Sequence, residues 1–389
     1  MKILHTADWH LGAYLGNFSR IDEQALFLQQ LCRIVDENGV DMVIIAGDIY
    51  DFSNPPAAAE ALFYSAMARL HEMKVPVVAI AGNHDSAERL DALTPMISEL
   101  GVHIFANPGT VEIKAGGNGQ SAIIAAMPFI SEKRLNEAIF SGSDEAAMQK
   151  QYSAKIGALF SRLTADFRQD TVNIAAGHFH IAGGEEAKGL ERDIQLGGVF
   201  AVNPADMPAA DYIAMGHLHR AQRIKCGPAA AHTAHYAGSP LPYSLSERGH
   251  PKSVNIVDIL PGRAATVDRI FLDCPKPIEI WTAATAPEAI EKCRQAGQSS
   301  AYKYIVITEE PAISAYDIKE MRGLAANIVS IELAADKPGT AAHIADALQE
   351  LSPREEFANF YAKSKGTPPG ERIVSIFDEV LSESDEEIS

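Results

Sequence analysis

The sequence predicts an α/β fold in which layers of strands and helices alternate. Short apolar runs, rich in β-branched and aliphatic residues, alternate with helix-like stretches over the first two-thirds of the 389 residues. Such runs are typical of buried strands, and their alternation with helices is typical of a layered α/β core. With 47% hydrophobic and 22% charged residues, the composition is that of an ordinary globular protein. The predicted strands are residues 2–5, 41–46, 75–81, 121–126, 171–176 and 211–215.

Helices are predicted between the first three of these strands. Residues 21–38 form the first, and Gly39 behind them is a typical helix stop. Residues 57–73 form the second, directly after Pro55 and Pro56. In both segments the apolar side chains recur at helical spacing: Leu28, Leu31, Ile34 and Val35, then Phe63, Met67 and Leu70.

Further elements are predicted downstream. A glycine-rich stretch at 116–119 separates two strand-like runs and is interpreted as a hairpin loop. Two more strands flank Pro261 and Gly262 between residues 253 and 272. Residues 274–277 contain two prolines and are interpreted as a linker. Beyond it, short elements predict a small α+β domain, with strands at 278–283, 304–308 and 328–333 and helices at 287–296 and 314–327.

We therefore expect a main domain at residues 1–272 and a small α+β domain at 276–340. Residues 353–381 carry two short amphipathic helices, rich in aromatic and aliphatic side chains. The following residues, 382–389, are predicted to form a solvated acidic tail. The pattern alone leaves two interpretations of the helix pair open: it docks on another protein, or it packs on its own domain.

Composition excludes several classes of protein. With 33 Lys+Arg against 51 Asp+Glu, the net charge of −18 argues against a protein that coats nucleic acid through its overall charge. The four cysteines include no C-x-x-C pair, which excludes a zinc ribbon and favours a reducing cytosol. No apolar run reaches the roughly 18 residues of a membrane span. Asp8 follows too soon after the start for a signal peptide. We expect a cytoplasmic protein without a membrane partner.

Polar motifs follow five of the apolar runs directly. Ligands at the carboxyl ends of neighbouring strands converge at the edge of an α/β sheet, so we expect these motifs to meet. Carboxylate, imidazole and amide oxygen without thiolate suit Mn²⁺, Fe²⁺ or Zn²⁺. The motifs are Asp8-Trp9-His10, Gly47-Asp48-Ile49-Tyr50-Asp51, Gly82-Asn83-His84-Asp85, Gly177-His178-Phe179-His180 and Gly216-His217-Leu218-His219.

Each motif also has a plainer interpretation. Alone, Asp48 to Asp51 could begin a helix, residues 83–85 could form a turn, and Asp-x-His pairs are common. That interpretation requires five independent polar clusters to fall at five strand ends by chance. The set instead fits two divalent ions that share one carboxylate and lie about 3.5–4 Å apart, an arrangement that clamps a phosphate and activates water.

The order of these motifs resembles that of the calcineurin-like metallophosphoesterases: D-x-H, G-D-x-x-D, G-N-H-D, G-H and G-H-x-H. The residues around the motifs narrow this resemblance to one family of metallophosphoesterases, the SbcD family of bacterial double-strand-break repair nucleases. They are residues 5–12, 81–86, 211–222 and 236–240. The resemblance implies a four-layered β-sandwich flanked by helices, with the α+β domain as a cap and a C-terminal helix pair.

The resemblance also implies roles for individual residues. His84 is similar to the phosphate-facing histidine of the family, and Asp85 is expected to orient it. His180 is placed outside the ligand set. Asp51 departs from the family pattern, because archaeal relatives carry a histidine there, and a carboxylate would repel phosphate. One metal would be held by Asp8, His10, Asp48 and His219, and the second by Asp48, Asn83, His178 and His217.

The implied activity is that of a metal-dependent DNA nuclease with two ions, most simply Mn²⁺. The family acts as a double-strand exonuclease and a single-strand and hairpin endonuclease in DNA repair, recombination and replication. Its members work as a homodimer within a heterotetramer, on DNA ends and hairpins. An SbcC-type ATPase would bind the C-terminal helices. Cleavage polarity, the preferred end and the native metal do not follow from the sequence.

Basic residues near the motifs are candidates for phosphate contacts: Arg89, Arg220 and Arg248. Each is equally well explained as a solvated surface cation. Two other functions compete with the nuclease. A phosphodiesterase for nucleotides or phosphoproteins has the same chemistry but needs neither the cap nor the helix pair. A non-catalytic DNA-end scaffold is disfavoured by the intact ligand set.

Overall fold

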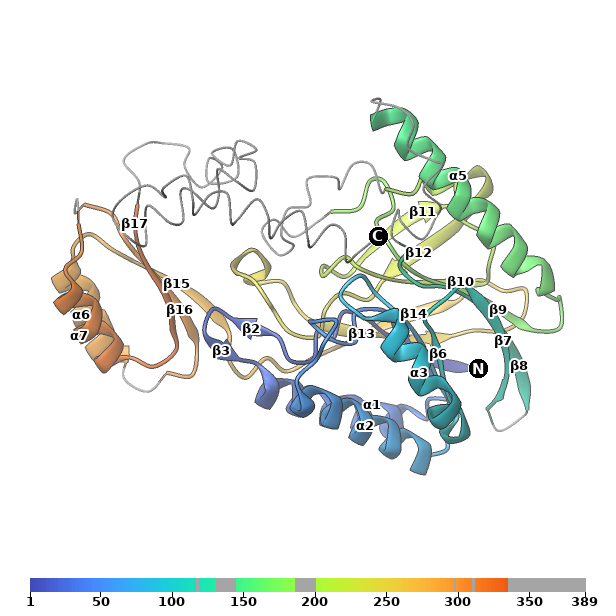
Figure 1. Ribbon diagram of the computed structural model, residues 1–389, viewed down its shortest axis with the longest axis horizontal. Coiled ribbons are helices and arrows are strands. Elements are labelled where there is room, and N and C mark those ends of the chain that lie inside the picture. Colours follow the sequence, from blue (N-terminus) through green and yellow to red (C-terminus); the bar gives the residue numbers. More distant parts are fainter. Residues whose placement is uncertain (117–118, 131–144, 186–200, 297–298, 310–311, 335–389) are drawn as a thin grey trace, which may run out of the picture. The chain divides into compact units, whose positions relative to one another are not determined.

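The computed structural model describes residues 1–116, 119–130, 145–185, 201–296, 299–309 and 312–334 (Figure 1). The predicted helix pair at 353–381, the tail at 382–389 and the end of the predicted α+β domain, 335–340, lie outside these residues. The chain divides into two units, Met1–Glu332 and Leu333–Ser389. The second unit contributes only Leu333 and Ala334 to the described part.

Two mixed sheets of six strands each form the centre of the first unit. The first sheet has the order β14-β13-β1-β4-β5-β6. The strands β1, β4, β5 and β6 are parallel, and β13 is antiparallel to both of its neighbours, β1 and β14. Its strands are β1 (Lys2–Thr6), β4 (Met42–Ala46), β5 (Val77–Ile80), β6 (Val102–Phe105), β13 (Ser253–Asp258) and β14 (Thr266–Phe271).

The second sheet has the order β11-β12-β10-β9-β8-β7, with its edge strands β7 and β11 antiparallel to their neighbours. The remaining neighbours in this sheet, β8, β9, β10 and β12, are parallel. Its strands are β7 (Gly109–Ala115), β8 (Gln120–Met127), β9 (Val172–His178), β10 (Tyr212–Gly216), β11 (Gln222–Cys226) and β12 (His232–Tyr236). A small hairpin, β2 (Tyr14–Leu15) with β3 (Phe18–Ser19), follows β1.

Successive side chains of a strand point to opposite faces of the sheet, so neighbouring residues lie in different cores. The membership of these cores shows the order of the layers. From β1, Leu4 packs with the helices α1 (Ile21–Asn38), α2 (Ala57–Glu72) and α3 (Ala87–Ile97), whereas Ile3 packs between the two sheets. On the far side of the second sheet, Tyr152 and Phe160 of α5 (Glu145–Leu163) form a third core. Mixed sheets flanked by helices therefore confirm the predicted α/β class.

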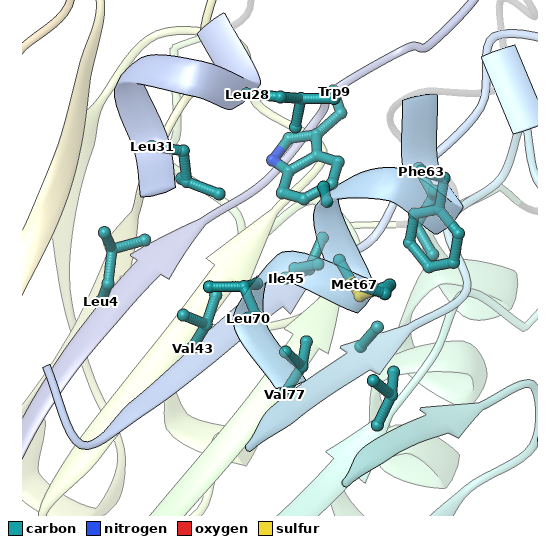
Figure 2. Packing of buried hydrophobic residues seen from close by; sticks show 14 of the residues in the cluster. Leu4, Trp9, Leu28, Leu31, Val43, Ile45, Phe63, Met67, Leu70 and Val77 are labelled. Carbon is teal, nitrogen blue, oxygen red and sulfur yellow. The ribbon is translucent and has the colours of Figure 1, made fainter. Parts of the chain in front are cut away.

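The core under α1 and α2 lies beneath the first polar motif. Figure 2 shows Trp9 beside Leu28, with Met67 of α2 near Ile45 and Leu70 of α2 near Val43. Trp9 is fully buried, and its indole nitrogen donates to Thr6 Oγ1 at 3.0 Å. Trp9 therefore packs as a core residue.

The α+β segment forms its own sheet, β15-β16-β17, and its own core. The strands β15 (Ile278–Ala283), β16 (Tyr302–Ile307) and β17 (Ile328–Leu333) carry the helices α6 (Ala286–Ala296) and α7 (Ala315–Leu324). Helix α7 begins at the Ser314 N-cap and ends where Ala325 turns extended, earlier than the predicted residue 327. Among the described residues, no helix is long and apolar enough to cross a membrane.

His5 should make folding stability sensitive to acid. Its ring is fully buried, with Nδ1 2.9 Å from Tyr212 Oη, and burial, followed by the nearby His235, lowers its pKa to about 3. The unfolded chain binds this proton below a pH of about 6.5 and the folded chain does not, so stability falls as pH drops from about 6.5 toward 3. We expect His5→Gln to reduce the slope of unfolding free energy against pH, measured in urea between pH 7 and 4.5, by about 1.4 kcal/mol per pH unit. An unchanged slope would contradict this assignment.

Candidate metal centre

The predicted ligands converge from both sheets. Strands β1, β4 and β5 of the first sheet lead into Asp8 and His10, Asp48, and Asn83, respectively. From the second sheet, β9 ends on His178, and β10 leads into His217 and His219. The backbones of the two sheets approach each other closely here. A Cβ added to Gly216 would lie only 1.8 Å from the Ala46 carbonyl oxygen. Ligands that are distant in sequence therefore share one small volume.

The backbone at these strand ends adopts conformations that non-glycine residues rarely use. Asp8, His10, Asp48 and His217 have φ angles of 53°, 45°, 48° and 90°. Hydrogen bonds between the loops hold them there: the Asp8 amide donates to the Gly47 carbonyl at 3.0 Å, and the His10 amide to the Asp48 carbonyl at 2.9 Å. Such strain is typical of functional sites, where the surrounding structure enforces it.

Asp48 lies at the centre of the cluster. Its Oδ2 is 3.3 Å from His178 Nε2 and 3.5 Å from His10 Nε2, and its Oδ1 accepts the His84 amide at 3.0 Å. Two groups of side chains could each hold a metal ion, and both contain Asp48: one adds His10 and His84, the other Asp8 and His178. A shared carboxylate between two groups is the arrangement of a two-metal site.

The other predicted ligands face the same volume. Asn83 Oδ1 lies 2.9 Å from His178 Nε2 and 3.2 Å from His217 Nδ1. The Nε2 atoms of His10 and His219 lie 3.0 Å apart. The Asp8 side chain is fully buried, and its Oδ2 has no hydrogen-bond partner among the described residues. A buried carboxylate oxygen without a donor, next to converging imidazoles, fits a bound cation.

The electrostatics of the cluster also fit a cation. Burial alone would raise the pKa of Asp48, but the adjacent His178, then His10 and His84, hold it well below its usual range. For His178, burial acts against protonation, yet Asp48 and Asp8 together raise its pKa to about 10. An imidazole ligand must be neutral, so a divalent ion held by His178 would take the place of that proton.

His84 is oriented by a backbone oxygen. Its Nδ1 lies 2.9 Å from the Asp51 carbonyl oxygen, which places the proton on Nδ1 in the neutral ring. Its ring also meets the His10 ring edge-on, with centroids 4.7 Å apart. The Asp51 carboxylate contacts His10 instead, with Oδ1 3.0 Å from Nδ1. Asp51 therefore contacts and orients a predicted metal ligand, at the position where the family resemblance implied a histidine.

Asp85 differs from the expectation that it orients His84. Its carboxylate accepts backbone amides from Gly82 at 2.8 Å, Tyr50 at 2.9 Å and Ile49 at 3.1 Å. It thus fastens the loop after β4 to the loop after β5. Burial, together with the charge of Asp48, raises its pKa to about 6. Asp85 therefore holds the backbone of the loop that contains Asp48. The His84 ring is hydrogen-bonded to the Asp51 carbonyl oxygen and not to Asp85.

The remaining candidates lie at the surface or beside the cluster. His180 Nε2 is 3.3 Å from the Gly184 carbonyl oxygen, outside both ligand groups. Arg89 pairs with Glu60 at 2.8 Å, and Arg220 pairs with Glu185, both at exposed positions. Arg248 is exposed and forms no ion pair with a residue in the described part of the chain. Contact of these three arginines with DNA stays a prediction.

Sequence reasoning missed two charged residues behind the cluster. Glu247 is fully buried, and Lys252 is 4% exposed. They form an ion pair, and Glu247 Oε1 lies 3.5 Å from His219 Nδ1. A glutamate and a lysine five positions apart are usually solvated, so the local sequence carries no signal of this burial.

This fold and this set of side chains define a metallophosphoesterase. A family model described as calcineurin-like phosphoesterase matches residues 1–221. Over the whole chain, the sequence is 38% identical to SbcD, the D component of the nuclease SbcCD, of Bacillus subtilis (strain 168), covering 100% of this chain and 99% of that protein. The proteins of the same name from Rhodobacter capsulatus and Escherichia coli (strain K12) are 34% and 31% identical, each covering 72% of this chain and 70% of the relative.

The chain therefore belongs to the calcineurin-like phosphoesterases and, within them, to the SbcD family of nuclease subunits. This confirms the predicted family and the predicted class of enzyme, a phosphodiester hydrolase that acts as a nuclease.

Proposed function

We propose that this chain is the nuclease subunit of a DNA-end-processing complex and hydrolyses DNA phosphodiesters with two divalent metal ions. The observation that carries the proposal is the pair of ligand groups that share Asp48 at the junction of the two sheets. Similarity over the full length to an SbcD nuclease supports DNA as the substrate. The activities proposed are exonuclease action on duplex ends and endonuclease action on single strands and hairpins.

The side chains divide between the two ions as follows. Asp8, His10, Asp48 and His219 are proposed for one ion, and Asp48, Asn83, His178 and His217 for the other. The short distance between the His10 and His219 Nε2 atoms supports the first set, and the distances from Asn83 Oδ1 to both rings support the second. Oxygen and imidazole donors without sulfur suit Mn²⁺.

In this proposal each residue has a defined part in hydrolysis. Bound ions would neutralise phosphate charge and lower the pKa of a water molecule. Asp48 belongs to both ligand groups and would hold them next to each other, and Asp51 orients the His10 ring through Nδ1. Water adds to phosphorus while the bond to the leaving oxygen breaks. The imidazolium form of His84, held by the Asp51 carbonyl oxygen through Nδ1, would transfer its Nε2 proton to that oxygen, or the ring would stabilise the charge on the phosphate.

We further propose that the chain acts with an SbcC-type ATPase, as a homodimer within a heterotetramer. The names of the relatives identify them as one subunit of a two-component nuclease. Residues 353–381 are the proposed docking element for the ATPase, and the α+β segment is proposed to cap the site and position DNA. The acidic overall charge is compatible with this division, because DNA affinity then comes from the ions, local basic residues and the partner.

The substrate assay compares linear duplex, hairpin and covalently closed DNA, with the ATPase, ATP and Mn²⁺ present. We expect the linear and hairpin substrates to be cut and the closed circle to persist. Omitting Mn²⁺ should stop cleavage. Turnover of a chromogenic phosphodiester without cleavage of any DNA would support the competing nucleotide phosphodiesterase.

His84→Gln should lower kcat for DNA cleavage by about 10²- to 10⁴-fold, because a glutamine cannot transfer a proton. Mn²⁺ affinity, measured calorimetrically without DNA, should stay unchanged if His84 faces the phosphate. His71→Gln is the matched control, since His71 lies exposed on α2, away from the cluster. A loss of Mn²⁺ affinity in His84→Gln would instead make His84 a metal ligand, which its place in one ligand group allows.

A further inference from the structure

The segment after β12 returns to the back of the metal cluster, where it contacts His219. On one edge of the His219 ring, Nε2 faces His10 Nε2 at 3.0 Å. On the other edge, Nδ1 lies 3.5 Å from Glu247 Oε1, beyond the usual hydrogen-bond distance, and Nδ1 has no hydrogen-bond partner among the described residues. His219 is 7% exposed and Glu247 is fully buried. The ring therefore lies between the proposed metal position and a buried carboxylate.

The Glu247 carboxylate is held by several donors. Oε1 accepts the Tyr243 amide at 2.9 Å, and Oε2 accepts the Ser239 hydroxyl at 2.9 Å and the Lys252 ammonium. Lys252 Nζ also donates to Ser239 Oγ at 2.7 Å and lies 3.4 Å from the His219 carbonyl oxygen. A carboxylate fixed by this many donors has little freedom to move away from the histidine.

Charge balance explains why a lysine is buried here. An unpaired carboxylate in this position would face a large desolvation penalty, which the adjacent ammonium offsets. The pair adds no net charge to the site, so Glu247 would act on His219 by accepting the Nδ1 proton and not through a net charge. A purely structural pair needs no contact with a predicted ligand, whereas this pair contacts both the ring edge and the backbone carbonyl of His219.

We propose that Glu247 is a positioning residue for the metal site: it accepts the Nδ1 proton of His219, so that Nε2 keeps its lone pair and points at the ion shared with His10. Lys252 neutralises the carboxylate. Tyr243 supports the same geometry, with its ring 5.4 Å from the His10 ring and 6.2 Å from the His219 ring. The inference rests on the proposed metal-binding role of His219.

The test uses two double variants that remove the buried ion pair as a unit. Glu247→Leu with Lys252→Met removes the acceptor and both charges, and apolar replacement of a whole buried pair is often tolerated. Glu247→Gln with Lys252→Met removes both charges but keeps a neutral acceptor. Mn²⁺ binding is measured without DNA, by calorimetry and by electron paramagnetic resonance, and thermal unfolding reports the fold. His219→Ala provides the reference for the loss of this ligand.

We expect the leucine double variant to bind one of its two Mn²⁺ ions about 10- to 100-fold more weakly, as is typical when the partner of a ligating histidine is lost. The second ion should bind as in the unsubstituted protein. The glutamine double variant should lose less affinity for the same ion, because an amide oxygen still accepts the Nδ1 proton, though more weakly than a carboxylate.

Affinity for both ions equal to that of the unsubstituted protein, in a folded leucine double variant, would overturn the proposal. If that variant does not fold, the glutamine double variant decides. Weaker binding of Mn²⁺ at the site that contains His219 supports Glu247 as a positioning residue, and unchanged Mn²⁺ affinity at both sites overturns the proposal. Failure of the unsubstituted protein to bind two ions would instead contradict the proposed metal site. The two failures are therefore distinguishable.

Discussion

Asp48→Asn is expected to lower DNA cleavage by about three orders of magnitude or more, the largest effect of any single side-chain change at the site. Asp48 is the carboxylate that both ligand groups share, and its Oδ2 lies within 3.5 Å of His10 and His178. With an amide in place of the carboxylate, both ions of the proposed site would lose their shared charged ligand at once. Loss of metal-assisted charge stabilisation in a dry site typically costs several kcal/mol of barrier.

The measurement pairs single-turnover cleavage of linear DNA with the shift in thermal unfolding temperature on adding Mn²⁺. Ions that bind only the folded state raise that temperature, and the rise should disappear in Asp48→Asn. Asp91→Asn is the matched control, because Asp91 is exposed on α3 and should leave both quantities unchanged. Cleavage by Asp48→Asn within tenfold of the unsubstituted protein would rule out the shared-carboxylate arrangement.

Strands whose side chains are buried on both faces give the clearest signal in the sequence. Strand β4 is such a case, with every residue from Met42 to Ala46 buried, so the apolar run is unbroken. Strand β11 is at a sheet edge and exposes Arg223 and Lys225 in alternation, which leaves no apolar run to detect. Helix α3 was not predicted either; Pro95 lies inside it, and a proline weakens the sequence pattern of a helix.

The convergence of the candidate ligands could be predicted because these residues follow strands whose carboxyl ends lie at one edge. The residues that support them could not be predicted, for physical reasons that differ from case to case. The partners of Asp85 are backbone amides, which no side-chain pattern encodes. The burial of Glu247 depends on where the segment after β12 turns back, which follows from packing over long sequence distances.

Gly216→Ala is expected to destabilise the fold by about 3 kcal/mol or more and to abolish binding of both ions. An added Cβ would lie 1.8 Å from the Ala46 carbonyl oxygen and 2.9 Å from its carbon, so backbone rather than a flexible side chain stands in its way. It would also lie 2.9 Å from His178 Nδ1. Forcing an extra methyl group into a packed core typically costs about 1–3 kcal/mol and more where the backbone must move.

The reason for the double effect is that Gly216 lies where β10 and β4 approach, and this approach brings the ligands of the two sheets together. Moving the sheets apart separates His178 and His217 from Asp48, so stability and metal affinity should fall together in urea unfolding and Mn²⁺ titration. Gly323→Ala is the control, because its Cβ would meet nothing within 4 Å and helix α7 should gain about 0.5–1 kcal/mol. A Gly216→Ala protein that retains its stability and binds two ions would show that the close contact of the sheets is not what assembles the site.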